Sequence, residues 1–414
     1  MNPDLDLSEI QVISKNQLQK VAIVGTHLHQ WQGMGKEGIL KTFKSHGFVQ
    51  LDPLNPAGRN HDFFFFARVP DYTQGQFEQI LYPKNMVFES HFHMLNAIHQ
   101  DHFSLFYCRK EEKFLGNYYQ KRLIEIRKKD PELLKSIVTH IDKNGAIGSQ
   151  DLPKFGKLAQ GEKWTKNSGA SALEILWATG KIAVVERDQQ FRKKFDLISK
   201  RFSSSQLEKR NITDQELWWE RLQLHIRSFA VTDSRIGISK SGILNFSKSK
   251  DAWTKRIGNQ IIKMSKSEKI QSDNDYSPTL VFCKEVNRLY IVPQKWKELL
   301  QENYDEEVRL IAPLDPLIWD RKFLKEIFNF DYVWEIYKPA KDRKWGYYVL
   351  PILYKGKFIG RVEANMKIKD RILRIISLRC ENKSFSTIIN KKLENLFLNW
   401  KRMCQASVIK KELN

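Results

Sequence analysis

Apolar positions at the start of the chain follow the period of an α-helix. Leu18, Val21 and Ala22 recur at the spacing of one helix face, and Ser14 before them is a residue type that caps helix starts. Residues 36–46 repeat the helical spacing and end at a glycine. The pattern therefore predicts two successive helices.

The next segment, FVQLD at 48–52, alternates as a β-strand does. Side chains two residues apart in a strand point to the same face, so Gln50 and Asp52 are expected to stand side by side. Leu51 between them would point into a core, and Pro53 would end the strand. An Asp at a strand end that caps a following helix explains this spacing equally well. An amide beside a carboxylate can also hold and activate one water molecule, the amide orienting it and the carboxylate accepting its proton.

Residues 86–93 alternate as well and predict a returning strand. The side chains on one face of that strand would be Glu89, His91 and His93. His99 and His102 are expected to follow in a helix. Histidines near a carboxylate suggest zinc, but no spacing here matches a metal signature, so a polar site lining is favoured and no metal is expected.

Residues 130–200 predict a winged helix. A helix at 131–145 is followed by a short strand, further helix and two alternating strands around a turn at 188–190. This is the order of a helix-turn-helix variant whose hairpin is the wing. Basic residues occur where such a domain contacts the DNA backbone, which favours DNA contact over a solvated surface. They are Lys166, before the candidate recognition helix, and Arg192, Lys193 and Lys194 on the wing.

The remaining chain predicts two further units. Residues 213–299 have a similar outline, with helices at 216–231 and 251–269 and a hairpin at 279–293. Residues 305–414 are rich in strands and end in a helix, which suggests a small β-barrel or open sheet. The predicted strands of this last unit lie within 331–339, 345–365 and 370–380.

Charge divides the 414 residues into two parts. The chain has 69 Lys and Arg against 48 Asp and Glu, a net charge of +21, and such an excess is typical of proteins that bind nucleic acid. Residues 1–107 have 8 basic and 10 acidic residues, whereas the remainder has 61 and 38. The first part also contains eight of the ten histidines. We therefore expect a site in the first part and a phosphate-binding surface in the rest.

Several classes of protein are disfavoured by absent motifs. No apolar run approaches the ~20 residues that cross a bilayer, and no signal peptide is visible, which predicts a cytoplasmic protein without a membrane partner. The four cysteines are scattered, as expected of reduced thiols. Phosphate-loop, dinucleotide and GxSxG motifs are missing, so no cofactor is expected.

Three segments together make the chain resemble the YcaQ/AlkZ family of DNA glycosylases. Residues 49–72, VQLDPLNPAGRNHDFFFFARVPDY, resemble the family's catalytic segment. Residues 87–95 resemble its Glu-x-Trp-x-His stretch, with His91 in place of the tryptophan. Residues 310–362 resemble the signature of its C-terminal domain.

The resemblance implies an α+β fold of three tandem winged-helix domains followed by a small C-terminal β-barrel. The domains would span 8–107, 130–200, 213–299 and 305–414. The catalytic motif of the family is a glutamine, an apolar residue and then Gln or Asp, which implies that Gln50 and Asp52 are catalytic. The implied activity is monofunctional excision of N7-alkylated guanines and unhooking of interstrand crosslinks in double-stranded DNA, by a monomer without metal.

The family motifs and the basic units supply a set of predicted substrate and DNA contacts. They are Arg59, His61, Arg68, Glu89, His91, His93, Lys166, Arg192, Lys193, Arg343 and Lys344. Two other classes stay open on the sequence: a winged-helix transcription regulator without catalytic activity, and a nonspecific nucleic-acid-binding scaffold. Neither would need Gln50 and Asp52 side by side.

Overall fold

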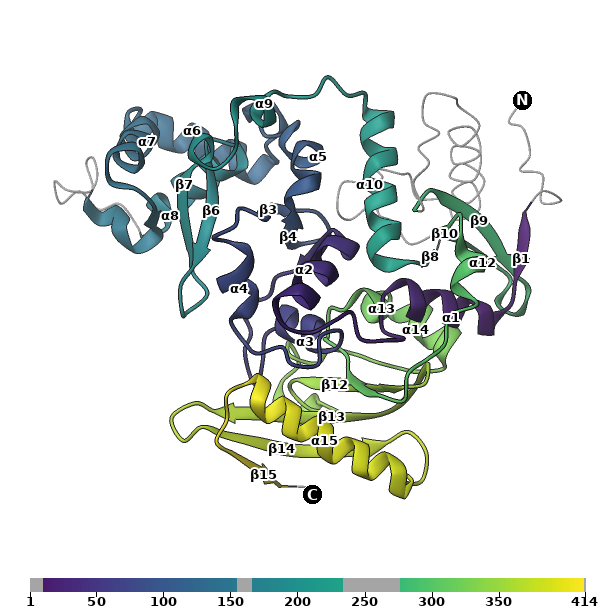
Figure 1. Cartoon of the computed structure of the whole chain (residues 1–414). Coiled ribbons are helices and arrows are strands. Elements are labelled where there is room, and N and C mark those ends of the chain that lie inside the picture. Colours follow the sequence, from purple (N-terminus) through teal and green to yellow (C-terminus); the bar gives the residue numbers. More distant parts are fainter. Residues whose placement is uncertain (1–9, 155–165, 234–275, 413–414) are drawn as a thin grey trace. The chain divides into compact units, whose positions relative to one another are not determined.

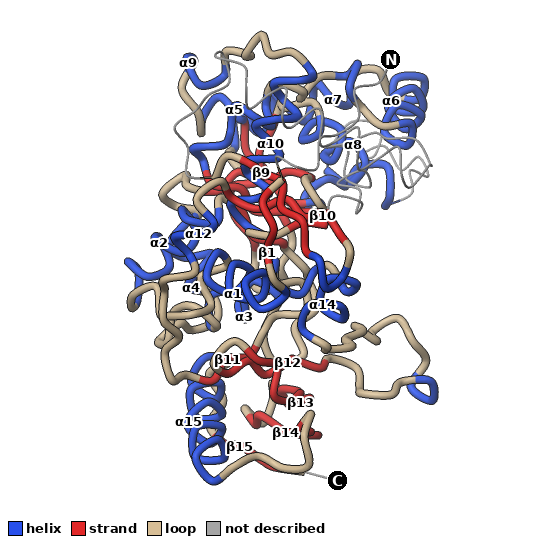
Figure 2. The backbone as a smooth tube through the Cα atoms, turned by 90° about the vertical axis from the view of Figure 1, so that its right-hand side faces the viewer, coloured by secondary structure: helices blue, strands red, loops and turns tan. Residues whose placement is uncertain are grey.

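The computed structural model describes residues 10–154, 166–233 and 276–412 and has a mixed α+β fold (Figures 1 and 2). The chain forms two compact units. One comprises Met1–Gln76, His91–Asn96 and Gln215–Asn414, and the other comprises Phe77–Ser90 and Ala97–Asp214. The first unit thus joins segments from both ends of the chain, which the predicted four-domain division separates.

The first unit begins with five elements: β1 (Gln11–Ile13), α1 (Lys15–Gly25), α2 (Gly35–His46), β2 (Phe48–Gln50) and α3 (Asn60–Phe66). A capping box, in which Ser14 and Gln17 exchange hydrogen bonds, fixes the start of α1 and confirms the predicted cap. Helix α2 ends at Gly47, whose φ of 78° lies in the left-handed region that glycine adopts without strain. That turn leads the chain directly into β2.

A four-stranded sheet joins the start of the chain to its third predicted unit. Its strands, in order, are β1, β9 (Pro278–Cys283), β10 (Arg288–Pro293) and β8 (Thr232–Asp233). The hairpin predicted at 279–293 is confirmed, and β1 pairs in parallel with β9, Val12 lying opposite Phe282. Helix α10 (Asp214–Phe229) confirms the helix predicted at 216–231, whereas the helix predicted at 251–269 lies outside the described residues.

The C-terminal part of the first unit contains a five-stranded half-barrel sheet. Its strands, in order, are β11 (Val308–Leu310), β12 (Val349–Tyr354), β13 (Lys357–Lys367), β14 (Ile372–Cys380) and β15 (Val408–Lys411). The predicted terminal helix is α15 (Thr387–Met403), drawn in yellow beside this sheet in Figure 1. β11 and β15 are the edges of this half-barrel, so of the two predicted alternatives, a small β-barrel or an open sheet, the strands form the open one. Three short helices complete the unit: α12 (Trp296–Leu299), α13 (Pro316–Trp319) and α14 (Arg321–Phe328).

The segment 331–339, predicted as a strand, is part of a long loop between α14 and β12 (Figure 2). The buried carboxylate of Glu335 organises the loop by accepting the Trp345 N–H at 2.7 Å, the Lys344 N–H at 3.2 Å and the Lys338 ammonium at 2.7 Å. Its alternating aromatic residues therefore do not form a sheet face, and Tyr337 is 86% exposed.

The second unit contains most of its elements between Gln76 and Leu207. They are α4 (Gln76–Leu81), α5 (Phe103–Tyr107), α6 (Asn117–Lys129), α7 (Leu133–Asn144), β5 (Ile147–Gly148), α8 (Lys166–Ala178), β6 (Ile182–Arg187), β7 (Lys193–Leu197) and α9 (Ser204–Leu207). The helix predicted at 131–145 and the hairpin around 188–190 are confirmed, and the sheet has the order β5-β7-β6. That three stretches of the chain each form a winged helix stays a prediction.

Strands β3 (Val87–His91) and β4 (Leu95–His99) follow α4 in a sheet of order β2-β4-β3. The predicted strand at 86–93 thus ends at His91, and His93 lies in a tight turn closed by the Phe92 N–H donating to the Met94 carbonyl at 2.9 Å. The three side chains predicted to share one strand face therefore do not share it. His99, which was predicted to lie in a helix, is the last residue of strand β4.

A fully buried ion pair anchors the end of α3 to the start of α13. The Arg68 guanidinium donates to both carboxylate oxygens of Asp315, at 2.8 and 3.2 Å, and both side chains are 0% exposed. It also donates to the carbonyls of Phe64 and Thr26, each at 2.9 Å. Arg68 therefore holds the fold together and does not lie on a surface that DNA could reach, contrary to its predicted role as a DNA contact.

We predict that Arg68→Met lowers the free energy of unfolding by about 3–5 kcal/mol, because it leaves the Asp315 carboxylate buried without its counter-ion. Urea unfolding measures this loss. The double variant Arg68→Met/Asp315→Leu should recover much of it, since no buried charge remains. If Arg68→Met is as stable as the wild type, or changes the salt dependence of DNA binding in a folded protein, this assignment of Arg68 is wrong.

Candidate active site

Gln50 and Asp52 stand at the end of β2. Both side chains are half-buried, while Leu51 between them is 4% exposed, as the strand alternation predicts. The Leu51 N–H donates to the Leu95 carbonyl at 2.9 Å, so pairing continues beyond Gln50. The alternation of side chains along a strand thus directs the amide and the carboxylate away from the core that Leu51 enters.

Asn60, the first residue of α3, fixes the backbone beside this pair. Its side-chain nitrogen donates to the Gln50 carbonyl at 2.9 Å, and its side-chain oxygen accepts the Leu314 N–H at 2.9 Å. The side chain is 1% exposed, so both bonds are shielded from water. The sequence does not reveal this role, because an asparagine at a helix start is common.

Asp52 experiences opposing electrostatic effects. Burial raises the pKa of its carboxyl group, whereas the Leu54 N–H, which donates to Oδ1 at 3.0 Å, and the nearby His61 ring lower it. The hydrogen bond from Leu54 closes a local turn around Pro53, and no helix begins between Asp52 and Asn60. Asp52 therefore does not cap a helix, which was the alternative explanation of its spacing.

The start of α3 forms a polar network next to Asp52. Asp62 accepts hydrogen bonds from the Arg59 N–H at 2.8 Å, the Tyr72 hydroxyl at 2.9 Å and the Gln74 amide at 3.1 Å. His61 is fully buried, and Arg59 is half-buried at the helix start. Of the two predicted contacts, only Arg59 thus reaches solvent.

Tyr348 is a residue beside Asp52 that sequence reasoning missed. It is 2% exposed, and its ring centroid lies 6.2 Å from that of Phe63 in α3. Burial raises the pKa of its phenol, and the charges of Tyr332, Asp52 and Asp62 raise it further. The C-terminal half-barrel thus contributes a neutral side chain to the surroundings of Asp52.

Glu89, a predicted substrate contact, is buried in the second unit. Arg187 donates to its two oxygens at 2.8 and 2.6 Å, and the Tyr82 hydroxyl donates to it as well. Although burial by itself raises the pKa of Glu89, the charge and hydrogen bonds of Arg187 keep it below the usual value. Its carboxylate is thus committed to an internal ion pair.

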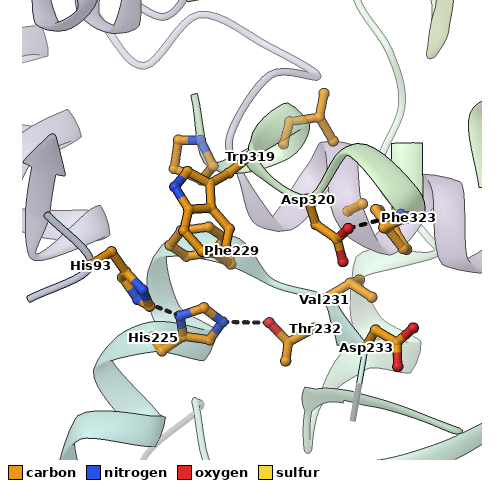
Figure 3. Close-up of a pocket in the computed structure, with 12 residues that line it drawn as sticks. His93, His225, Phe229, Val231, Thr232, Asp233, Trp319, Asp320 and Phe323 are labelled. Atoms are coloured by element: carbon orange, nitrogen blue, oxygen red, sulfur yellow. Dashed lines mark hydrogen bonds between the residues drawn. The ribbon is translucent and has the colours of Figure 1, made fainter. Parts of the chain in front are cut away.

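The other two predicted histidine contacts, His91 and His93, differ in their surroundings. His91 is exposed at the end of β3, whereas His93 is buried, and its Nε2 lies 2.8 Å from Nδ1 of His225 in α10 (Figure 3). The other ring nitrogen of His225 is hydrogen-bonded to the Thr232 hydroxyl. Burial lowers the pKa of His93 to about 3, so the ring is neutral at physiological pH.

His93 lies in the wall between two small cavities. One is also lined by Gln50, together with Phe48, Val49, Phe64, Asn96, Phe229, Leu314 and Pro316. The other cavity, shown in Figure 3, is also lined by His225, by its hydrogen-bond partner Thr232, and by Trp319 and Asp320. Phe229 and Pro316 also line both cavities. A buried histidine pair therefore extends from the side of Gln50 to an aromatic cavity, and sequence reasoning found only its first member.

The predicted DNA contacts of the second unit vary in exposure. Arg192 is exposed on the turn and pairs with Asp188 at 2.6 Å. Lys193 packs over the Trp177 ring, 4.2 Å from its centroid, and binds Glu174 at 2.8 Å. A lysine held in this way is a weaker candidate for phosphate contact than the sequence suggests. Lys166 is the first residue of α8.

The predicted contacts Arg343 and Lys344 lie in the loop before β12. Lys344 is exposed, and Arg343 is half-buried with its guanidinium 4.9 Å from the Tyr347 ring centroid. The exposed Tyr337 lies in the same loop. Cations and aromatic rings therefore occur together on this loop, as they do on nucleic-acid-binding surfaces.

Two further properties were searched for in the described parts of the chain. No three His, Cys, Asp or Glu side chains gather there in an arrangement that could hold a metal ion. Nor does any helix among those residues combine the length and the apolar composition that a bilayer crossing needs.

Comparison with known proteins identifies the class of this site. The profile of the family described as DNA glycosylase AlkZ-like matches residues 43–384, which include Gln50, Asp52, His93 and the loop before β12. The solved structure of Streptomyces sahachiroi DNA glycosylase AlkZ is similar, with a TM-score of 0.62 and 12% identity over 98% of this chain and 100% of that one. The chain belongs to the AlkZ-like family of DNA glycosylases.

Family membership confirms the resemblance inferred from the motifs. The protein is a DNA glycosylase, an enzyme that hydrolyses N-glycosyl bonds of DNA. The transcription regulator and the nonspecific scaffold, both open on the sequence alone, are therefore disfavoured.

We predict that the protein loses stability in acid because of its buried neutral histidines. Unfolded histidine titrates near pH 6.5, whereas burial lowers the pKa of His93 and of His27 to about 3. Between these values the unfolded chain binds more protons, so stability is complete above pH 6.5 and falls as pH drops toward 3. Urea unfolding at pH 7.5 to 4 should show a slope of up to about 1.4 kcal/mol per pH unit for each ring.

The variant His93→Gln provides the control for this prediction. Its unfolding free energy should depend less steeply on pH than that of the wild type, because unfolding of the variant takes up as much as one proton fewer. An unfolding free energy that stays constant from pH 6.5 to 4 would contradict the prediction.

Proposed function

We propose that the enzyme excises N7-alkylated guanines from double-stranded DNA and unhooks interstrand crosslinks formed through that position. The observation that carries the proposal is the half-buried Gln50 and Asp52 pair at the end of β2, beside a cavity lined by Gln50, His93 and aromatic rings. We further propose that it acts as a cytoplasmic monomer without metal and that its chain forms three winged helices.

The chemistry fits a cationic base. An N7-alkylated guanine carries a positive charge, so the electron pair of the breaking N-glycosidic bond neutralises the departing base, and little protonation is needed. The sugar becomes oxocarbenium-like, and the Asp52 carboxylate stabilises it electrostatically. A water oxygen then attacks C1′ while Asp52 accepts its proton, and Gln50 orients that water.

The surroundings of the pair support this assignment. The partly raised pKa of Asp52 makes it a stronger base than a free carboxylate, while the Leu54 N–H and His61 keep the ionised form accessible. His93 is neutral, so it does not repel a cationic base. Phe48, Phe64 and Phe229 line the adjoining cavity, and the faces of aromatic rings attract cations.

We predict that Asp52→Asn abolishes base release while DNA affinity changes little. Asparagine retains an oxygen that can accept the Leu54 N–H, so the turn is preserved and only the charge is lost. Gln50→Ala should slow the reaction strongly through lost positioning. Single-turnover reactions on duplex containing N7-methylguanine, followed by alkaline cleavage of abasic sites, measure both effects.

The matched control is Asp142→Asn, an exposed aspartate of α7, which should release base at the wild-type rate. A near wild-type rate for Asp52→Asn would refute the catalytic assignment. Borohydride trapping of a covalent complex with DNA would contradict the monofunctional mechanism.

We propose that the loop between α14 and β12 contacts DNA in the first unit, and that α8 and Arg192 on the β6–β7 turn do so in the second unit. Arg343 and Lys344 supply positive charge, and Tyr337 supplies an exposed ring. The hydrogen bonds of Glu335 hold the loop in one conformation, so little entropy is lost when it binds. The net charge of +23 after residue 107 supports such a surface.

We predict that Lys344→Glu weakens binding to damaged and undamaged duplex alike. Loss of one phosphate contact should reduce the slope of log affinity against log salt by about 0.9. Fluorescence anisotropy at several salt concentrations measures the slope. The matched control is Lys357→Glu. Lys357 is an exposed lysine at the start of β13, where it pairs with Tyr354 at the end of β12. Equal effects of the two reversals would show that only overall charge matters.

A further inference from the structure

The hydrogen bonds of the histidine pair define the direction in which protons are donated. The three side chains are buried, with exposures of 7% for His93, 2% for His225 and 9% for Thr232. Nε2 of His93 lies 2.8 Å from Nδ1 of His225, and Nε2 of His225 is bonded to the Thr232 hydroxyl (Figure 3). Two neutral imidazoles can share a hydrogen bond only if one donates and the other accepts.

The Thr232 hydroxyl determines which ring donates. Within the described parts of the chain, Nε2 of His225 is the group with which this hydroxyl is hydrogen-bonded. If Thr232 donates its proton there, Nε2 of His225 is an acceptor and Nδ1 carries the hydrogen. Nδ1–H of His225 then donates to Nε2 of His93. The opposite arrangement would leave the buried hydroxyl hydrogen without an acceptor among the residues that the structure describes, which is unfavourable.

We propose that His225 and Thr232 are positioning residues that hold His93 in the neutral tautomer with its proton on Nδ1. His93 lines the cavity that also contains Gln50, so this arrangement fixes the ring that the cavity presents. The proposal rests on the proposed function, because it gives the fixed ring its use beside a cationic base.

A fixed neutral ring suits that substrate for an electrostatic reason. A protonated imidazole would repel an N7-alkylated guanine, and the repulsion would be strong in a site with few waters. With Nε2 of His93 already accepting from His225, a proton can add there only by breaking that bond. The stacking of His225 on Phe229, with ring centroids 4.2 Å apart, also holds the donor ring in place.

Packing around the pair limits the motion of both rings. The His93 ring centroid lies 5.1 Å from Phe229 and 5.2 Å from Trp319, and Phe229 lies 5.6 Å from Trp319. Aromatic rings from α10 and α13 thus enclose the hydrogen bond. Burial is the cause that lowers the pKa of both histidines, and the charge of His93 lowers that of His225 further.

The test compares two replacements of His225. Asparagine places an amide near the position of Nδ1 and can still donate to His93, whereas leucine cannot. Single-turnover release of N7-methylguanine should fall at least tenfold in His225→Leu and recover most of the wild-type rate in His225→Asn. Thr232→Val should slow release less than His225→Leu, and Thr232→Ser should restore the rate.

The tautomer itself is measured by long-range ¹H–¹⁵N correlation spectra of histidine-labelled protein, which require no catalysis. In the wild type His93 should be protonated on Nδ1, and in His225→Leu the spectrum should shift toward the Nε2–H form. The control is Thr26→Val, which also removes a buried hydroxyl from the first unit but should leave rate and tautomer unchanged.

The outcomes separate this proposal from the proposed function. His93 protonated on Nε2 in the wild type, or equal rates for folded His225→Leu and His225→Asn, would overturn the positioning role. If neither the wild type nor any variant releases N7-methylguanine but the spectra show the Nδ1–H form, the hydrogen-bond assignment stands and the proposed substrate is wrong.

Discussion

The buried ion pair between Arg68 and Asp315 is the interaction that joins the end of α1, α3 and the start of α13 within the first unit. Removing both charges from water is costly, and the cost is offset because each of the three guanidinium nitrogens of Arg68 donates to a close partner. Those partners lie at the end of α1, within α3 and at the start of α13. Asn60, the first residue of α3, links the same helix to the Gln50 carbonyl and to the Leu314 N–H. The end of β2 is thus held from the side of α3, next to the ion pair.

This scaffold produces an unusual electrostatic environment for a basic protein. The net positive charge lies after residue 107, whereas Asp52 lies in the nearly neutral first part, where burial raises the pKa of its carboxyl group and the Leu54 N–H and His61 lower it. Arg68 is matched by Asp315, and His46 and His93 remain neutral because burial disfavours their charged forms. Under the proposed function, a cationic base that approached Asp52 would therefore meet no unpaired positive charge from Arg68. Under the proposed function, attraction of DNA and stabilisation of the reacting sugar would be carried by different parts of the chain.

The sequence predicts those features that depend on local pattern. The Ser14 cap, the burial of Leu51 between two half-buried polar side chains, and the hairpin around 188–190 all follow from residues within a few positions of one another. The parallel pairing of β1 with β9 does not, because no local pattern specifies a partner so distant in the chain. The hydrogen bonds of Asn60, His225 and Thr232 cannot be predicted from the sequence for the same reason, because they form only when separate segments come together in the fold. Sequence-based assignment of single charged residues fails for a related reason: Arg68 and Lys193 look like phosphate contacts until their partners are known.

His91, where the family motif that this segment resembles has a tryptophan, lies apart from the aromatic rings beside Gln50. His91 is exposed at the end of β3, whereas the aromatic surface beside Gln50 comes from β2, α3 and α10 through Phe48, Phe64 and Phe229. These rings are buried in the first unit, and His91 does not line the cavity that they form beside Gln50. A change there removes an aromatic ring at the edge of a hairpin but leaves the aromatic cavity and the hydrogen-bonded His93 intact. The aromatic and polar groups that surround Gln50 are therefore supplied by β2, α3 and α10 and by His93, and not by the residue at position 91.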